Sequence, residues 1–93
     1  MSQRRNRLEI MRDILNVIRE KSGKIKPTHI LYKSNLSHQM MEEYLGELIK
    51  KGFIVELAME KTRGKTYSIT NKGITFLEKY RMIADFTESF GLG

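Results

Sequence analysis

The sequence predicts a single α+β domain over residues 1–93, in which three short helices are followed by a β-hairpin and one longer helix. Two changes of pattern carry this prediction. Apolar residues recur every three or four positions up to Lys51, as in amphipathic helices, and alternate after Gly52, as in strands. The helical spacing returns at residue 72. The hydrophobic fraction of 40%, with a single proline, is that of a folded globular chain.

The first helix is expected at residues 6–21. Asn6 and Glu9 have the spacing of a capping box, and the Ser22-Gly23 pair ends the helical pattern. The apolar stripe consists of Leu8, Met11, Ile14, Leu15 and Ile18. Residues 24–26 that follow are too few for more than an extended connector or a minimal strand.

Two further helices are expected at residues 27–34 and 37–51, separated by a tight break. Pro27 suits the first position of a helix, and Asn35 tolerates the left-handed backbone that such a break requires. In the shorter helix the expected core residues are Ile30, Leu31 and, as a further candidate, Tyr32. In the longer helix they are Met40 or Met41, Tyr44, Leu45, Leu48 and Ile49. A short helix, a turn and a longer helix form the outline of a helix-turn-helix.

A β-hairpin with a basic tip is expected at residues 53–70. In its first strand Phe53, Val55 and Leu57 are expected on one side, opposite Ile54, Glu56 and Ala58. The second strand is expected at residues 66–70. The intervening residues 60–65 include three positive side chains, so the hairpin has the character of a wing beside the helix-turn-helix.

The last helix is expected at residues 72–90, with Thr70 and Asn71 as caps. Ile74 and Leu77, with Ala84 as a further candidate, are expected to close the core. A second apolar seam exceeds what one small domain can bury, and it predicts a homodimer through this helix. The predicted interface residues are Phe76, Tyr80, Ile83, Phe86 and Phe90.

Seventeen Lys and Arg residues against eleven Asp and Glu give a net charge of +6, which favours polyanionic partners. A helix fits the major groove of double-stranded DNA, which is about 12 Å wide, while a wing reaches the adjacent backbone or minor groove. The residues expected to face base edges are Ser37, His38, Gln39 and Glu42. Those expected to meet phosphates are Arg4, Arg5, Arg7, Lys24, Lys26, Thr28, Lys33, Lys61, Arg63 and Lys65.

The sequence favours neither an enzyme nor a cofactor protein. It has no cysteine, and its two histidines, nine residues apart, lack the further ligands of a metal site. Phosphate-binding loops and nucleophile motifs do not occur. We therefore expect no cofactor, no metal and no small-molecule ligand. No apolar run approaches the roughly 20 residues of a membrane span, so a cytoplasmic, nucleoid-associated protein is expected.

Five stretches of the sequence resemble one family: residues 35–37 (NLS), 44–45 (YL), 48–54 (LIKKGFI), 67–73 (YSITNKG) and 76–77 (FL). They are similar to small archaeal winged-helix proteins that are regarded as transcriptional regulators or chromatin proteins. The resemblance implies a winged helix-turn-helix that binds double-stranded DNA. It also implies dimerisation through the C-terminal helix, often as an antiparallel coiled coil.

A second hypothesis is a winged helix that binds another protein rather than DNA, since the fold serves both purposes. The acidic residues Glu42, Glu43 and Glu47 on the third helix favour this alternative, whereas the basic hairpin favours DNA. In that case the candidate contact residues are ordinary solvated side chains.

Overall fold

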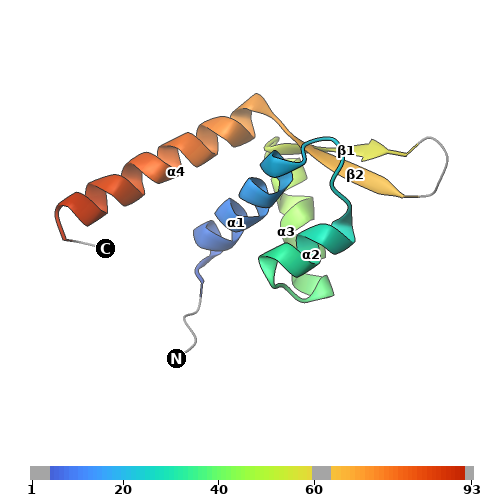
Figure 1. Ribbon diagram of the computed structural model, residues 1–93, viewed down its shortest axis with the longest axis horizontal. Coiled ribbons are helices and arrows are strands. Elements are labelled where there is room, and N and C mark those ends of the chain that lie inside the picture. Colours follow the sequence, from blue (N-terminus) through green and yellow to red (C-terminus); the bar gives the residue numbers. More distant parts are fainter. Residues whose placement is uncertain (1–4, 60–63, 92–93) are drawn as a thin grey trace.

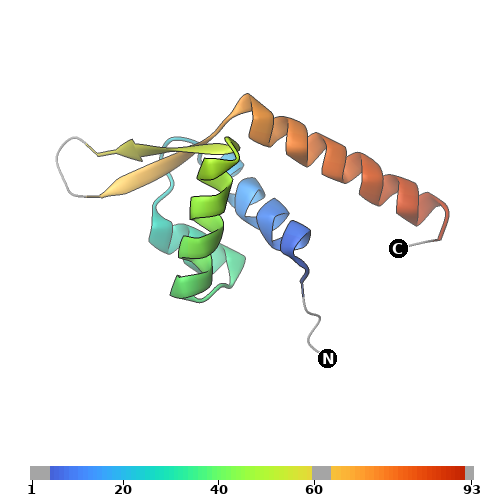
Figure 2. The ribbon, with the colours of Figure 1, turned by 180° about the vertical axis from the view of Figure 1, so that it is seen from behind.

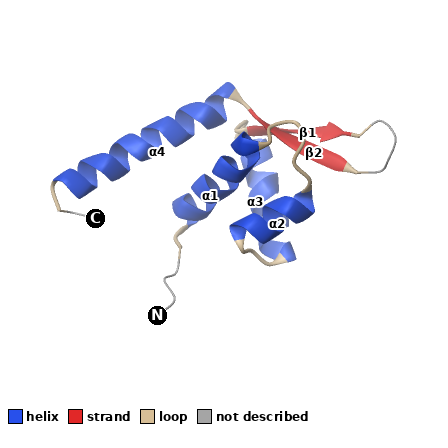
Figure 3. Cartoon of the chain, viewed as in Figure 1, coloured by secondary structure: helices blue, strands red, loops and turns tan. Residues whose placement is uncertain are grey.

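The computed structural model describes residues 5–59 and 64–91 and has the predicted winged-helix architecture. Its elements are α1 (Arg7–Glu20), α2 (Pro27–Ser34), α3 (His38–Lys50), β1 (Ile54–Ala58), β2 (Lys65–Ile69) and α4 (Asn71–Ser89). Helices α1, α2 and α3 form the body of the molecule, and Figures 1 and 2 show the hairpin and α4 leaving it in opposite directions. Figure 3 shows the two strands as the only sheet in the described part of the chain.

The helix boundaries follow from local capping interactions. The Asn6 side chain accepts a hydrogen bond from the Glu9 N–H at 2.8 Å, and the Glu9 carboxylate accepts from the Asn6 N–H at 3.2 Å, which confirms the capping box. At the end of α2, Asn35 has the left-handed φ of 53°. The Ser37 hydroxyl then caps α3 by accepting from the Met40 N–H. Each helix therefore begins and ends within one residue of its predicted bounds.

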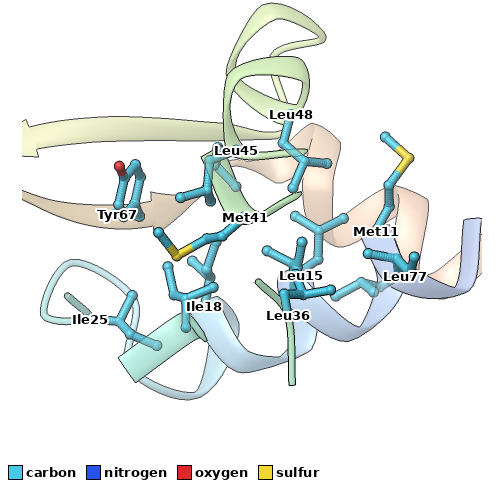
Figure 4. Close-up of a cluster of buried hydrophobic side chains, with 14 residues drawn as sticks. Met11, Leu15, Ile18, Ile25, Leu36, Met41, Leu45, Leu48, Tyr67 and Leu77 are labelled. Carbon is cyan, nitrogen blue, oxygen red and sulfur yellow. The ribbon is translucent and has the colours of Figure 1, made fainter. Parts of the chain in front are cut away.

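One face of α1 forms the centre of the core. Ile14, Leu15 and Ile18 have no exposed surface, and Figure 4 shows Leu15 and Ile18 facing the apolar side of α3. Ile25 pairs with Tyr67 of β2 as an isolated bridge, so the segment between α1 and α2 is a connector with a single β-bridge. This bridge joins the hairpin to the helical body.

Some residues predicted for the core are exposed. Tyr32 is 80% exposed, because Ile30 and Ser34 define the buried side of α2 and Tyr32 lies midway between them on the opposite side. Leu8 and Ile49 lie at the edges of their apolar stripes, where neighbouring elements no longer cover them. Of the two methionines left open in α3, Met41 is buried and Met40 is exposed.

The sequence left open which of the two sides of β1 faces the core. Ile54 is its buried residue, whereas Val55 and Leu57 are 45% and 41% exposed. The strands pair in antiparallel register, with Ile54 opposite Ile69 at the base and Ala58 opposite Lys65 toward the tip. Farther along the hairpin the buried residues are Thr66 and Tyr67 of β2, so the outer part of β1 does not face the core. The second strand also begins one residue earlier than predicted.

Helix α4 begins at a close contact with the end of α3. The Thr70 hydroxyl donates to the Gly52 carbonyl at 2.7 Å and accepts from the Gly73 N–H at 3.1 Å. A Cβ on Gly73 would collide with the Phe53 carbonyl and would lie 2.8 Å from Ile69 Cγ1. Glycine at this position therefore sets how closely α4 approaches the hairpin. Beyond it Leu77 is buried as predicted, whereas Ala84 is exposed.

Replacing Gly73 with alanine is expected to destabilise the fold by about 2 kcal/mol, because the methyl group must displace backbone rather than a flexible side chain. The measurement is equilibrium denaturation, in which the midpoint should fall while the slope is unchanged. Thr75→Ala, on the exposed side of the same helix, serves as the control and should not lower the stability. An unchanged midpoint for Gly73→Ala would contradict the close packing.

Candidate nucleic-acid interface

The exposed face of α3 adjoins the hairpin. A hollow of about 460 Å³ lies between α3, the first residue of α2 and both strands. The residues lining it are Pro27, His38, Met41, Glu42, Leu45, Gly46, Ile49, Glu56, Lys65 and Tyr67. Three predicted contact residues, His38, Glu42 and Lys65, are thus brought to one surface.

The predicted residues at the start of α3 are all exposed. The Ser37 hydroxyl caps α3 by accepting a hydrogen bond from the Met40 N–H. It therefore lies next to the unpaired backbone N–H groups of the first turn of α3. Gln39 points away from the core, and His38 lies 3.8 Å from the Glu42 carboxylate one turn later. The hydrogen-bonding groups of these side chains are open to an external partner.

Two acidic residues near this face are paired with basic residues from other elements. The Glu47 carboxylate binds the Arg7 guanidinium, which also lies 5.7 Å from the centre of the Tyr44 ring. Glu56 lies 3.4 Å from the Lys65 ammonium across the hairpin. These pairs reduce the negative charge that a polyanion would meet, so α3 is less acidic in the structure than its sequence indicates.

The Lys65–Glu56 pair also sets local protonation. The hydrogen bond to Glu56, followed by the nearby Tyr67 phenol, raises the pKa of Lys65. Burial raises the pKa of the Tyr67 hydroxyl. At neutral pH Lys65 is therefore a cation and Tyr67 is uncharged.

A second hollow, of about 520 Å³, carries four lysines and an exposed aromatic ring. We call it the basic hollow, and it is lined by Lys21, Lys24, Lys26, Thr28, His29, Tyr32 and Lys33. Within residues 5–59 and 64–91, none of the four lysines makes an ion pair with a carboxylate. The hollow therefore has unneutralised positive charge beside a ring that can contact a partner.

The sequence prediction found only part of this surface. Lys24, Lys26, Thr28 and Lys33 were predicted, whereas Lys21, His29 and Tyr32 were not assigned to a site. Tyr32 was instead expected in the core. The spacing between Ile30 and Tyr32 was the available signal, because two positions in a helix place side chains on nearly opposite sides.

Arg5 was predicted to meet phosphate, but the structure gives it internal partners. Its Nη1 donates to Asp13 at 2.8 Å, and its Nη2 donates to the carbonyls of Ser34 and Asn35 at 2.8 and 3.3 Å. Arg5 thus ties α1 to the turn of the helix-turn-helix. Arg4, Lys61 and Arg63, also predicted to contact phosphate, lie outside the described residues.

Replacing Arg5 with alanine is expected to lower the free energy of unfolding by about 1–2 kcal/mol, because two carbonyls and a carboxylate lose a charged donor. Equilibrium denaturation provides the measurement. Arg19→Ala removes the same charge from an exposed position on α1 and should change stability far less. Equal stability of Arg5→Ala and Arg19→Ala would show that the Arg5 contacts contribute nothing.

The predicted seam of α4 divides into two parts. Phe76 packs against Phe53 at a ring distance of 5.2 Å, and the Tyr80 ring lies 5.1 Å from the Arg12 guanidinium, so both contact their own domain. Past this point α4 leaves the body of the molecule (Figure 1). The exposed residues there, which we call the terminal apolar face, are Met82, Ile83, Phe86 and Phe90. Met82 was missed by the sequence prediction.

The described part of the chain contains neither a metal-binding cluster nor a membrane-spanning helix. No group of three or more His, Cys, Asp and Glu residues there could hold a metal ion. Nor is any helix in residues 5–59 and 64–91 long and apolar enough to cross a membrane.

Comparison with known proteins supplies the family. Residues 4–88 match the model of the winged helix-turn-helix family. The chain belongs to this family. A relative, the uncharacterized protein MJ0290 of Methanocaldococcus jannaschii, is 35% identical over 78 residues. That match covers 84% of this winged-helix chain but only 33% of the relative, so the chain spans about a third of the relative's length.

Solved structures share the winged-helix fold. Sso10a-2, a DNA-binding protein from Sulfolobus solfataricus, is 26% identical with a TM-score of 0.78, over 92% of this chain and 85% of that chain. The PcaV transcriptional regulator from Streptomyces coelicolor has 16% identity and a TM-score of 0.77, over 87% of this chain and 60% of that chain. FabT of Streptococcus pneumoniae, solved with DNA, has 19% identity and a TM-score of 0.70, over 89% and 59% of the two chains. The last two likenesses concern the fold alone.

Proposed function

We propose that this winged helix binds double-stranded DNA as a transcriptional regulator or chromatin-type protein. The observation that carries the proposal is the basic hollow, whose four lysines have no carboxylate partner among the described residues. Such a surface attracts phosphates and releases counterions on binding. The DNA-binding description of Sso10a-2, which matches most of both chains, supports the same function.

In the proposed complex α3 enters the major groove and the hairpin reaches the adjacent backbone or minor groove. Gln39 has the chemistry to pair with adenine, and Glu42 can accept from the cytosine amino group. His38 can contact guanine or phosphate, and Ser37 lies where the first turn of α3 meets the duplex. The proposed phosphate contacts are Arg4, Lys24, Lys26, Thr28, Lys33, Lys61, Arg63 and Lys65. Arg5 is assigned to positioning the turn instead.

We also propose a homodimer through the terminal apolar face. Ile83, Phe86 and Phe90 are 65%, 59% and 66% exposed, and the last two rings lie 4.8 Å apart. An apolar surface of this kind on one helix is best covered by another apolar helix. Phe76 and Tyr80 are less available, because each already contacts its own domain.

The DNA proposal predicts salt-dependent binding to random-sequence duplex DNA, measured by fluorescence anisotropy at several salt concentrations. Replacing Lys61, Arg63 and Lys65 with alanine should reduce the slope of log affinity against log salt by up to ~3, since each lost phosphate contact removes about one unit. Replacing Lys24 and Lys33 in the basic hollow should reduce it by up to ~2.

The matched control for the basic hollow is Arg19→Ala with Lys79→Ala, which removes two positive charges from exposed positions on α1 and α4. This control should leave the slope near the wild-type value. An equal loss of slope in both double variants would mean that net charge acts without a localised interface. A wild-type chain that binds no DNA at low salt would overturn the DNA proposal itself.

The dimer proposal predicts that Ile83→Glu with Phe86→Glu produces a monomer, because two buried carboxylates in an apolar interface are costly. Light scattering measures the mass, and circular dichroism should report an unchanged fold. The control is Arg81→Glu with Ala84→Glu, which adds acidic residues at exposed positions on the other side of the same helix. A wild-type chain that stays monomeric at high concentration would contradict the proposal.

A protein-binding winged helix is the second candidate function. It is favoured by Glu42 and Glu43, which remain exposed on α3 after Glu47 is neutralised by Arg7. Salt-insensitive capture of a partner protein, together with no affinity for DNA, would support this alternative.

A further inference from the structure

Gly46 occupies an unusual place for a glycine. It lies inside α3, four residues before the end of the helix, and its position is exposed. Glycine in a helix interior is less stable than alanine by about 0.5–1 kcal/mol, because it loses more backbone freedom on folding. An exposed helical position would therefore ordinarily favour alanine or a longer side chain.

Nothing inside the described part of the chain requires glycine at this position. Among the five glycines whose surroundings the structure describes, three have a positive φ, and a Cβ on Gly73 would collide with backbone. Gly46 has neither property: its backbone is helical, and an added Cβ would meet no atom within 4 Å. Contacts within the described residues therefore give no reason for glycine here, whereas a partner that approaches the α3 backbone closely would give one.

The residues around Gly46 indicate which surface of the molecule such a partner would contact. Gly46 is on the wall of the hollow between α3 and the hairpin, and one helical turn separates it from Glu42, Glu43 and Lys50. The α3 backbone is therefore exposed at Gly46, between these three longer side chains. The buried residue Leu48, two positions later, lies on the opposite side of the helix, so Gly46 is on the outer side.

We propose that Gly46 is the point at which the α3 backbone comes closest to the DNA, and that its missing side chain sets how deeply α3 enters the major groove. The proposal rests on the DNA-binding function proposed above. A helix with its side chains is about 10–12 Å across, and the major groove is about 12 Å wide. The helix therefore fills the groove with little space left between them. A single Cβ, about 1.5 Å from its Cα, would hold the helix farther out.

The depth of α3 matters most for the side chains that would read the bases. Hydrogen bonds of Gln39 and Glu42 to base edges weaken steeply when the donor and acceptor separate by more than a few tenths of an ångström. Lysine contacts to phosphate tolerate such a shift, because they depend on charge rather than on tight geometry. Gly46 is therefore assigned to specificity, separately from the basic surface that supplies affinity.

The experiment compares wild type with Gly46→Ala and Gly46→Leu, using the tightest duplex that the wild-type chain recovers from a random-sequence pool. Gly46→Ala should raise the thermal midpoint by about 4 °C, since alanine favours the helix. The same change should weaken binding to this duplex by about tenfold, as for the loss of one base-pair contact, and Gly46→Leu should weaken it further. The salt slope should not change, because every lysine is retained.

The control is Thr75→Ala, another helix-favouring change at an exposed position, but in α4. It should leave the affinity for the selected duplex unchanged. Light scattering of each variant verifies that the oligomeric state is the same. Opposite effects on stability and binding, confined to Gly46, would distinguish a DNA-contact position from a structural one.

The outcomes separate this inference from the proposal on which it rests. If the wild-type chain binds no duplex from the pool, the DNA-binding function fails. If wild type binds but both Gly46 variants bind equally well, only the assignment of Gly46 is overturned. A Gly46→Ala variant that is less stable than wild type would also overturn it, because glycine would then have a role within the fold.

Discussion

The buried face of α1 contacts α2, β2 and α4, and the relative positions of these elements depend on it. Ile14, Leu15 and Ile18 are completely buried along this face. Because protein interiors are close-packed, a shift of α1 would move the hairpin and α4 together. The Ile25–Tyr67 bridge adds a backbone link between the same helical body and the hairpin. The proposed reading helix and wing are thus held by one core, and α3 also contacts β1 directly.

Basic residues in this chain have two different uses. Arg5, Arg7 and Arg12 all contact carboxylates of the same molecule, and Arg5 also binds the turn between α2 and α3. The lysines of the basic hollow have no such partners among the described residues. This division fits the chemistry of the two side chains, since the planar guanidinium makes several directed hydrogen bonds and the ammonium acts as a mobile point charge. A net charge of +6 therefore says little about where a polyanion would bind.

Helix α4 joins a domain-forming half to an exposed half. Gly73 and Leu77 are buried against the domain, whereas Ile83, Phe86 and Phe90 extend past it. If the proposed dimer forms, the rigid start of α4 would fix the angle between the two copies. The spacing of the two proposed reading helices on a duplex would then depend on the contact between Gly73 and the Phe53 carbonyl.

The sequence by itself determined the elements and their order, because the interactions that start and stop them are local. The Asn6–Glu9 capping box and the Ser37 and Thr70 caps join residues three apart, so their spacing is visible in the sequence. Only the tertiary structure decided which surfaces are free. Arg5 donates a hydrogen bond to the carbonyl of Ser34, which is 29 residues away in the sequence. Tyr32 lies beside lysines that come from outside α2. Such partners depend on how the helices pack, and the periodicity of a single segment carries no information about them.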